Sequence, residues 1–261
     1  MKWRRIEGLL LKCWWITTQR VDRMFDIFYW PVLDIFIWGL FSNYFASESS
    51  FDPLKVILGG IILWLFLWRN AQDVSVYVLE EYWSKNLYHL FSSPVTIGEF
   101  ILSLMIVALG RTIVSALFLV FIAYLLYSFS FFTLPLIWLG YFMACLILAG
   151  WFVGMMISSL ILRYGGRIQA LAWAVVWIIQ PFSCVFYPLS SLPGWAYAIA
   201  RWNPLTYVFE GMRAVINAEQ LSGRAVLYPG LASVLLFVVG CLVLGLIFKK
   251  ARKAGYLAKP E

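Results

Sequence analysis

Few residues in this 261-residue chain have a type and spacing that could carry chemistry. The sequence has one histidine, His89, and four widely separated cysteines, which are Cys13, Cys145, Cys184 and Cys241. An active site needs a nucleophile beside a base, or a cluster of acids and histidines, and this sequence assembles neither. The cysteines are typical of small apolar positions in helices, and His89 is typical of a surface or packing residue. The residue types therefore do not predict an enzyme.

Two acids, Asp26 and Asp34, lie in or beside an apolar stretch, where a carboxylate can carry protons across a membrane. Transporters that run on ion gradients are typically built from inverted repeats with broken helices, and no internal repeat is apparent here. Asp26 also lies near the edge of its stretch, and Asp34 can hydrogen-bond within an oligomer. Secondary transport through these two acids is therefore the alternative hypothesis.

The most polar run with helical character is RWNPLTYVFEGMRAVI, at residues 201–216. Asn203 can cap a helix, and Pro204 can occupy its first position. Glu210 and Arg213 are three residues apart and therefore share a helix face. The run is too short to cross a bilayer.

The composition determines the class of protein to which these residues belong. Of all residues, 63% are hydrophobic and 13% are charged, against about 25% charged in soluble domains. We therefore predict an all-α integral membrane protein that forms a single domain, 1–261, with six transmembrane helices. The candidate spans are residues 25–45, 54–68, 112–130, 135–160, 168–188 and 229–248.

Lysine and arginine are distributed unevenly, and this distribution predicts the orientation. Fifteen of the 20 cations lie in the segment 1–23, the loops 69–97 and 161–167, and the tail 249–261, whereas three lie in the segment 189–228. We therefore predict that both termini are cytoplasmic and that 189–228 is outside. The net charge of +7 is then a topology signal, and nucleic acid is not an expected partner.

The segment 1–23 predicts an amphipathic helix at the membrane interface. One face carries Trp3, Ile6, Leu10, Trp14 and Val21, and the opposite face carries Arg5, Lys12, Gln19 and Arg23. Such a helix points its cations at anionic lipid. It either anchors the chain only, or also leans on a cytosolic partner.

The loop 69–97 contains VLEEYWSKNLYHLF, which predicts a helix over 79–91 that ends at Ser93-Pro94. Glu81 and Lys85 have the favoured i,i+4 order of a helical ion pair. Leu79, Trp83, Leu87 and Leu90 form an apolar stripe. This short cytosolic helix is either a docking element or a helix on the lipid surface.

Arg111 interrupts the apolar run IGEFILSLMIVALGRTIVSALF. A span that begins at Thr112 leaves Arg111 at the cytosolic edge, where arginine can snorkel to water. The alternative is that Arg111 lines a cytosolic vestibule for an anionic substrate. In the next apolar run, Gly150 and Gly154 permit close helix packing.

The outer segment predicts two short helices in tandem, one from Ser190 or Ser191 to about Arg201 and a second over 204–217. Pro181 can kink the preceding span near its outer end. Neither helix can cross a bilayer, so the two form a re-entrant hairpin or an external cap. Glu210 and Arg213 are then expected to face each other or a partner subunit.

The motifs VFYPLSSLPGW and NPLTYVFEGMR before the last span, and SSPVT after the cytosolic helix, resemble those of ABC-2-type transporter permeases. The resemblance covers essentially the whole chain. It implies a dimer of permeases, expected here to be a homodimer, with two ATPase subunits. It also implies a coupling helix over 79–91 and an outer gate over 193–217. No GxxxxGK[ST] motif occurs in the sequence, so we expect no cofactor in this chain, with ATP and Mg²⁺ in the partner ATPase.

The resemblance assigns expected roles to individual residues. The residues expected to dock the ATPase are Glu80, Glu81, Trp83, Lys85 and Leu87. The outer gate is expected to contain Pro193, Asn203, Pro204, Glu210 and Arg213. A possible substrate path contains Trp64, Trp68, Arg111, Trp173, Trp177, Phe182 and Tyr187.

The expected activity is export of an amphipathic or lipid-linked substrate, such as a glycan, lipid or drug, across the inner or plasma membrane. Aromatic faces stack on sugar rings and also shelter lipids and drugs. The alternative is that these aromatic residues are ordinary interfacial belts and packing residues. Membrane lipids are expected partners in either case.

The predicted topology can be tested by labelling single cysteines in sealed cells. Cysteines that replace Ser49 or Ser222 should react with an impermeant thiol reagent from outside, and one that replaces Ser84 should not. Labelling at position 84 from outside would contradict the predicted orientation.

Overall fold

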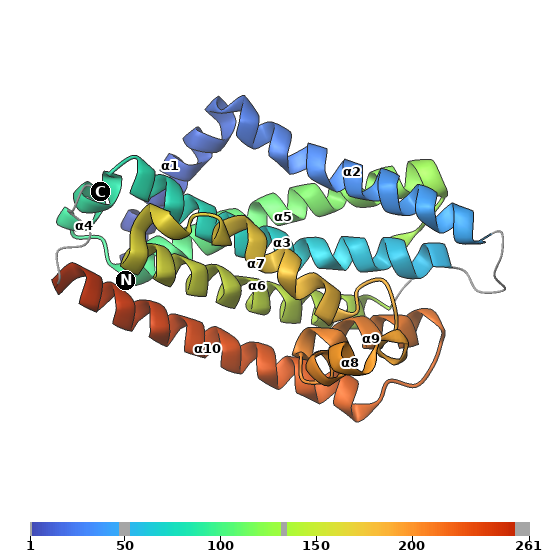
Figure 1. Cartoon of the computed structure of the whole chain (residues 1–261). Coiled ribbons are helices and arrows are strands. Elements are labelled where there is room, and N and C mark those ends of the chain that lie inside the picture. Colours follow the sequence, from blue (N-terminus) through green and yellow to red (C-terminus); the bar gives the residue numbers. More distant parts are fainter. Residues whose placement is uncertain (1, 47–52, 132–134, 254–261) are drawn as a thin grey trace.

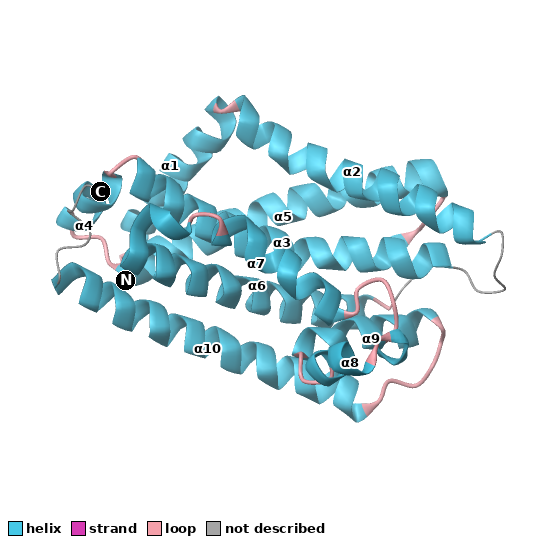
Figure 2. Ribbon diagram, viewed as in Figure 1, coloured by secondary structure: helices cyan, strands magenta, loops and turns pink. Residues whose placement is uncertain are grey.

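The computed structural model describes residues 2–46, 53–131 and 135–253, and within these ranges the chain is helical, with no strands (Figure 2). Five long helices lie side by side (Figure 1). They are α2 (Val21–Ala46), α3 (Pro53–Trp83), α5 (Ile97–Tyr127), α6 (Leu136–Tyr164) and α10 (Gly223–Lys253). Helix α3 contacts α2, α5 and α6 and is therefore the centre of the bundle.

The shorter helices lie at the two ends and on one flank of the bundle (Figure 1). Helices α1 (Trp3–Gln19) and α4 (Asn86–Ser92) lie at the end that also holds the first and last described residues. Helices α8 (Gly194–Ala200) and α9 (Pro204–Ile216) lie at the opposite end. Helix α7 (Leu171–Ile179) packs against α3 and is flanked by 3₁₀ turns at Gly165–Ile168 and Gln180–Ser183; a further 3₁₀ turn covers Leu189–Ser191.

The prediction of an all-α multi-pass membrane protein is confirmed. The described residues contain five helices that are long and apolar enough to cross a membrane. They are Arg23–Ser42, Leu54–Trp83, Ile97–Tyr127, Leu136–Ile168 and Gly223–Lys253. The predicted fifth span, 168–188, contains only a shorter apolar helical segment, Leu171–Ser183. The count of six spans and the re-entrant hairpin therefore stay predictions.

The prediction that residues 69–97 form a loop is wrong over its first half. Helix α3 does not end at residue 68 but continues to Trp83. Lys85 then adopts a left-handed backbone conformation with φ of 55°, so the helix predicted over 79–91 is divided. Only Asn86–Ser92, as α4, forms the separate helix. The polar residues of 69–83 can stay in the bundle because partners on other helices neutralise them, as described below.

The predicted start of the third span at Thr112 is also wrong. Helix α5 begins at Ile97, where the Thr96 hydroxyl accepts a hydrogen bond from the Glu99 backbone N–H at 3.3 Å. The Glu99 carboxylate in turn accepts one from the Thr96 N–H at 3.0 Å, which completes a capping box. This reciprocal arrangement satisfies two backbone donors at the helix start. Arg111 consequently lies in the middle of α5.

The remaining boundaries differ less from the predictions. Helix α10 begins at Gly223, six residues before the predicted span at 229–248, with Pro229 inside the helix. The two short outer helices form as α8 and α9, and α9 begins at Pro204 as predicted. The labelling position Ser49 and residues 254–261 of the predicted tail lie outside the described residues.

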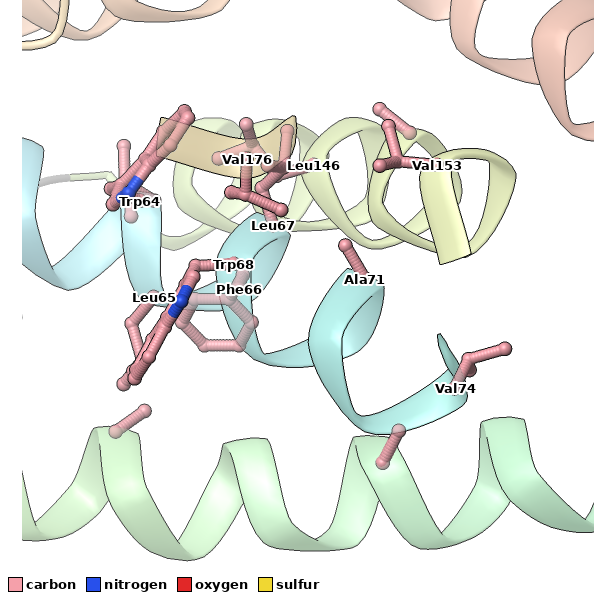
Figure 3. Packing of buried hydrophobic residues seen from close by; sticks show 14 of the residues in the cluster. Trp64, Leu65, Phe66, Leu67, Trp68, Ala71, Val74, Leu146, Val153 and Val176 are labelled. Carbon is pink, nitrogen blue, oxygen red and sulfur yellow. The ribbon is translucent and has the colours of Figure 1, made fainter. Parts of the chain in front are cut away.

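The core forms where α3 packs against α6 and α7. Figure 3 shows Leu67 of α3 beside Leu146 of α6 and Val176 of α7. Gly150 and Gly154 make this approach possible, because a Cβ at Gly150 would lie 2.6 Å from the Leu67 carbonyl oxygen. The predicted role of these two glycines in close helix packing is therefore confirmed.

The other end of α3 is packed equally closely. A Cβ at Gly60 would lie 2.9 Å from the carbonyl oxygen of Val185, which belongs to the connection between α7 and α8. Helix α3 has 31 residues and is therefore about 45 Å long. It connects the end that carries α4 to the end that carries α8 and α9.

We predict that Gly154→Ala destabilises the protein, because its Cβ would lie 2.9 Å from the Ala71 carbonyl oxygen and from Val74 Cβ. Overpacking of this kind costs about 1–3 kcal/mol. The matched control is Gly140→Ala on the same helix, where nothing lies within 4 Å of the added atom. Thermal unfolding of the purified protein in detergent should show a lower Tm for Gly154→Ala only. Equal Tm values for both variants would show that α3 and α6 can move apart without loss.

Candidate functional site

Four charged side chains meet inside the bundle, and we call them the central charge network: Asp26 of α2, Arg69 and Asp73 of α3, and Arg111 of α5. Arg69 donates to the Asp26 carboxylate at 2.6 Å and to the Asp26 carbonyl at 2.7 Å. Arg111 donates to Asp73 at 2.8 Å and to Asp26 at 3.3 Å. The exposed fractions of Arg69, Asp73 and Arg111 are 0%, 2% and 6%, so these three side chains are shielded from water, whereas the Asp26 side chain is 27% exposed.

The central charge network is electrically balanced, with two guanidinium groups and two carboxylates. A single unpaired charge in such an interior costs several kcal/mol, whereas a paired and hydrogen-bonded one does not. Helix α5 begins at Ile97, so Arg111 does not lie at the start of its helix as the predicted edge position requires. The alternative that Arg111 lines a cytosolic vestibule stays a prediction. The Arg111 charge is accommodated by two acids that lie 38 and 85 residues away in the sequence.

The contacts of the central charge network include one of the two acids considered for proton transport, Asp26, but not the other, Asp34. Asp26 is bound by two guanidinium groups, one from α3 and one from α5. It is therefore a structural ion-pair partner rather than a free carboxylate. Asp34 also belongs to α2, is half-buried, and takes no part in the central charge network.

A second set of ion pairs connects α1 and the start of α2 to the end of α3. Lys12 forms an ion pair with Glu81, and Arg23 forms one with Glu80. Arg20 lies 3.5 Å from Glu80. Two acids that were expected to dock an ATPase are thus bound within the chain. The predicted Glu81–Lys85 pair is not the one that forms, because α3 ends between these two residues.

Helix α1 turns two of its cations, Arg5 and Lys12, toward the protein. Arg5 lies 3.6 Å from Glu99 and donates to the Pro94 carbonyl, and the Lys2 backbone N–H donates to Glu99 at 2.9 Å. The prediction that Arg5, Lys12 and Arg23 point at lipid is therefore wrong. Large apolar side chains of α1 are exposed instead, and they are Trp3, Leu11, Trp14 and Trp15.

The opposite face of α1 is packed on the bundle. Ile6, Leu9 and Cys13 are buried there. Burial raises the pKa of the Cys13 thiol to about 11, so at neutral pH it is an unreactive packing residue. This agrees with the expectation that the cysteines occupy small apolar positions.

Helix α4 is held by one face and exposed on the other. Leu87 is buried, and Leu90 and Phe91 pack against the core. Tyr88 is 54% exposed, and His89 beside it is also exposed. The Asn86 side chain donates to Glu81 at 2.5 Å and so fixes the helix start.

The remaining expected docking residues lie around the break between α3 and α4. Trp83 and Lys85 are exposed, and the Trp83 ring stacks on Trp173 of α7 with centroids 6.2 Å apart. Together with Tyr88 and His89 they form an exposed surface at this end of the bundle, which we call the α4 surface.

The expected path residues do not converge on one site. Trp64 and Trp68 are buried in the chain, whereas Trp173 and Trp177 of α7 are exposed. The rings of Trp68 and Trp177 lie 6.4 Å apart and form a continuous aromatic contact from the interior to the surface. Arg111 belongs to the central charge network instead.

Phe182 and Tyr187 lie farther along, at the end that carries α8 and α9. The Phe182 ring meets Trp195 of α8 edge to face at 6.2 Å. The Tyr187 hydroxyl donates to the Pro181 carbonyl at 2.5 Å. Both therefore shape the chain between α7 and α8, where Pro181 ends the regular helix with a 3₁₀ turn.

The predicted Glu210–Arg213 pair forms, with a distance of 2.8 Å. Each residue also binds the preceding connection. Arg213 donates to the Cys184 carbonyl at 2.8 Å, and Glu210 accepts from the Leu189 backbone N–H at 2.7 Å. The pair therefore fastens the segment 184–189 to α9.

Asn203 anchors the start of α9 as predicted. Its side-chain oxygen accepts from the Leu205 N–H at 3.1 Å, which caps the helix before Pro204. Its amide nitrogen donates to the Phe182 carbonyl at 3.0 Å. Pro193 directly precedes the first turn of α8 in an extended conformation. These contacts join both short helices to the end of α7.

The functional residues that sequence reasoning missed are Arg69 and Asp73. Their i,i+4 spacing was a usable signal, since two opposite charges on one helix face can neutralise each other. The capping box of Thr96 and Glu99 was a second missed signal. Within the described ranges, no three His, Cys, Asp or Glu side chains converge in a way that could hold a metal ion.

We predict that Glu210→Gln and Arg213→Gln each lower stability by about 2–3 kcal/mol, between the values for exposed and buried pairs. The exchange Glu210→Arg with Arg213→Glu should not restore it. A carboxylate at position 213 would face the Cys184 carbonyl, and a guanidinium at 210 would face the Leu189 N–H.

The measurement is Tm and yield of the purified protein, with Arg201→Gln as control, because Arg201 is an exposed arginine in the same outer segment. The control should behave as wild type. Restoration by the exchange would mean that Glu210 and Arg213 stabilise mainly each other and not the connection.

Comparison with known protein families matches residues 9–217 to the model described as ABC-2 type transporter. No curated protein matches the chain.

Proposed function

Because this chain belongs to the ABC-2 type transporter family and is thus a membrane permease component of an ABC transporter, we propose that it serves an ATP-driven exporter. The exporter moves an amphipathic or lipid-linked substrate, such as a glycan, lipid or drug, out of the cytoplasm. The chain carries no phosphate-cradling GxxxxGK[ST] motif, so ATP and Mg²⁺ bind to a separate ATPase subunit.

The observation that carries the proposal is the α4 surface. It is exposed at the same end of the bundle as the first and last described residues. The uneven lysine and arginine distribution supports a cytoplasmic position for this end. Helix α4 is seven residues long and cannot itself cross a membrane. The hydrogen bond from Asn86 to Glu81 joins α4 to α3. A movement of α4 would therefore also move α3.

The complete transporter contains two copies of the ATPase and two permeases. The second permease is another copy of this chain, so the permease pair is a homodimer. It lies in the inner or plasma membrane with both termini in the cytoplasm. The segment of α8 and α9 forms the outer gate, and the Glu210–Arg213 pair holds it in place. The exposed aromatic side chains of α7 are suited to apolar parts of an amphipathic substrate.

The contacts of Asp26 argue against secondary transport. A proton-carrying acid must exchange its proton with water or substrate during the cycle, whereas Asp26 is bound by Arg69 and Arg111. Loss of its charge would leave two buried guanidinium groups with only Asp73 as a partner. The ATP-driven mechanism requires no such change in this chain.

We predict that Tyr88→Ala combined with His89→Ala lowers the amount of co-purifying ABC ATPase at least tenfold. The two side chains are exposed and contribute little to folding, so Tm should stay unchanged. These positions give a cleaner test than Glu81, whose replacement would also release Lys12 and Asn86.

The control is Trp195→Ala combined with Tyr197→Ala, a pair of exposed aromatic residues at the opposite end. It should retain the ATPase, identified by mass spectrometry and by ATP hydrolysis of the purified complex. If the α4 variant keeps both the ATPase and its coupled activity, α4 is a helix on the lipid surface and not the docking element.

A further inference from the structure

An apolar pocket lies beside the point where α1 and α2 meet. We call this point, residues 19–21, the elbow. There Arg20 has an extended backbone that separates the two helices, and they run at an angle to each other (Figure 1). Side chains of α1, α2 and α5 line the pocket, so three helices of one chain supply its walls. Its volume is about 770 Å³.

The walls of the pocket are mainly hydrocarbon, with one charged residue of each sign. These are an acid, Glu7, and a base, Arg111. Arg111 is already bound within the central charge network, and Glu7 is exposed. The hydroxyl groups of Thr17 and Thr18 donate to backbone carbonyls of α1 itself. The pocket therefore favours an uncharged, apolar ligand over an ion.

The pocket lies at the edge of the hydrocarbon layer of the membrane. Helix α5 has 31 residues, of which about 20 suffice to cross the hydrocarbon. Tyr124 and Tyr127 are at the end of α5 that is farther from α1, and tyrosine is enriched at membrane interfaces. Counting about 20 residues back from Tyr127 brings the other boundary to about residue 108. Gly110 and Arg111 therefore lie just inside it, where acyl chains begin.

The shape of the pocket selects among apolar occupants. Its lining residues on α1 extend from Glu7 to Thr18, which is three turns or about 16 Å. A helix with its side chains is about 10 Å wide, so three turns of a helix from another chain need more than about 1,000 Å³. The pocket is too small for such a helix. A flexible linear chain that needs no hydrogen bonds fits both its length and its walls.

Gly110 leaves space on the α5 side of the pocket. A Cβ there would meet nothing within 4 Å. Glycine is less favourable than alanine inside a helix, and neither a close neighbouring atom nor a positive φ requires it at this position. A ligand that lies against the backbone of α5 accounts for a residue without a side chain.

The pocket is separate from the expected substrate path. The exposed aromatic residues of that path, Trp173 and Trp177, belong to α7, which packs on α3 and α6. No residue of α7 lines the pocket at the elbow. An occupant of this pocket is therefore a resident component of the permease and not the transported compound.

We propose that the pocket binds one acyl chain of a membrane phospholipid. The chain lies between Leu11 and Trp14 of α1 and Phe28 of α2, against Gly110 of α5, and the head group stays outside in the interface. The bound chain fills the space beside the elbow and so connects α1 to both spans. The site does not depend on the proposed exporter function or on the ATPase.

The test is native mass spectrometry of the full-length protein with an equimolar mixture of phosphatidylcholine and phosphatidylglycerol that have identical long acyl chains. The wild type should retain one lipid per chain, and the two head groups should be retained equally, because the pocket contacts only the acyl chain. A short-chain phosphatidylcholine should be retained at least about tenfold less.

A variant that fills the pocket locates the binding. Gly110→Leu places a side chain in the open space and should lower lipid retention at least about tenfold without lowering Tm, since the added atoms meet no neighbour. The control is Gly140→Leu, the same change at a position of α6 that is equally open but does not line the pocket. It should retain lipid as wild type does.

A second measurement does not depend on the stability of a variant. Phosphatidylcholine with a photoreactive group in its acyl chain is bound to wild type, loosely held lipid is washed away, and the cross-linked peptides are identified after irradiation. Cross-links should fall on residues 7–18 of α1 and 107–114 of α5, and Gly110→Leu should remove them.

Five results would overturn the proposal. They are no lipid retained by wild type, a several-fold preference for one head group, unchanged retention by Gly110→Leu, an equal loss in Gly140→Leu, and cross-links confined to other helices. Dimers of lipid-free wild type that Gly110→Leu abolishes would assign the pocket to a second copy instead. Lipid that is retained through its chain and lost only in Gly110→Leu supports the proposal, whether or not the ATPase binds to α4.

Discussion

The bundle depends on four charges that must stay together. Asp26, Arg69, Asp73 and Arg111 come from three helices, and no subset of three is electrically neutral. A shift of α2 or α5 by one turn, about 5.4 Å, would leave at least one charge unpaired in the interior. Helices α2, α3 and α5 are therefore held in one register. The positions of α1 and α4 follow from that register, because both are bound to the ends of α3 and α5.

The sequence was sufficient to predict what depends on local chemistry. Asn203 and Pro204 mark the start of α9, Glu210 and Arg213 share a face, and Gly150 and Gly154 allow α6 to approach α3. Each of these predictions uses residues within one helix or beside its start. The apolar composition likewise predicted a membrane bundle, although the segment after α6 is a short helix between 3₁₀ turns and not a regular span.

The wrong predictions concern charged residues whose ion-pair partners are distant in the sequence. A charge in an apolar stretch was taken to mark the end of a span, so α3 was ended before Arg69 and α5 was started after Arg111. Both helices continue because the partner acids arrive from other helices, which a reading along the chain does not detect. The same applies to Glu81, whose partner is Lys12 at a separation of 69 residues and not Lys85 in the next turn. For the candidate site, the sequence thus indicated several of the residues that take part, such as Glu81 and Arg111, but not the residues with which they form ion pairs.

Helix α3 has a mechanical consequence. It is unbroken over 31 residues, and its far end touches the Val185 backbone so closely at Gly60 that no side chain would fit between them. A rod about 45 Å long that tilts by about 5° displaces one tip by about 4 Å relative to the other. A small displacement of α4 would therefore be transmitted along α3, because α3 has no break between its two ends. It would reach the segment 184–189, which Arg213 and Glu210 bind to α9. If α4 docks the ATPase as proposed, the contact of Gly150 and Gly154 with α3 would be the pivot of this tilt.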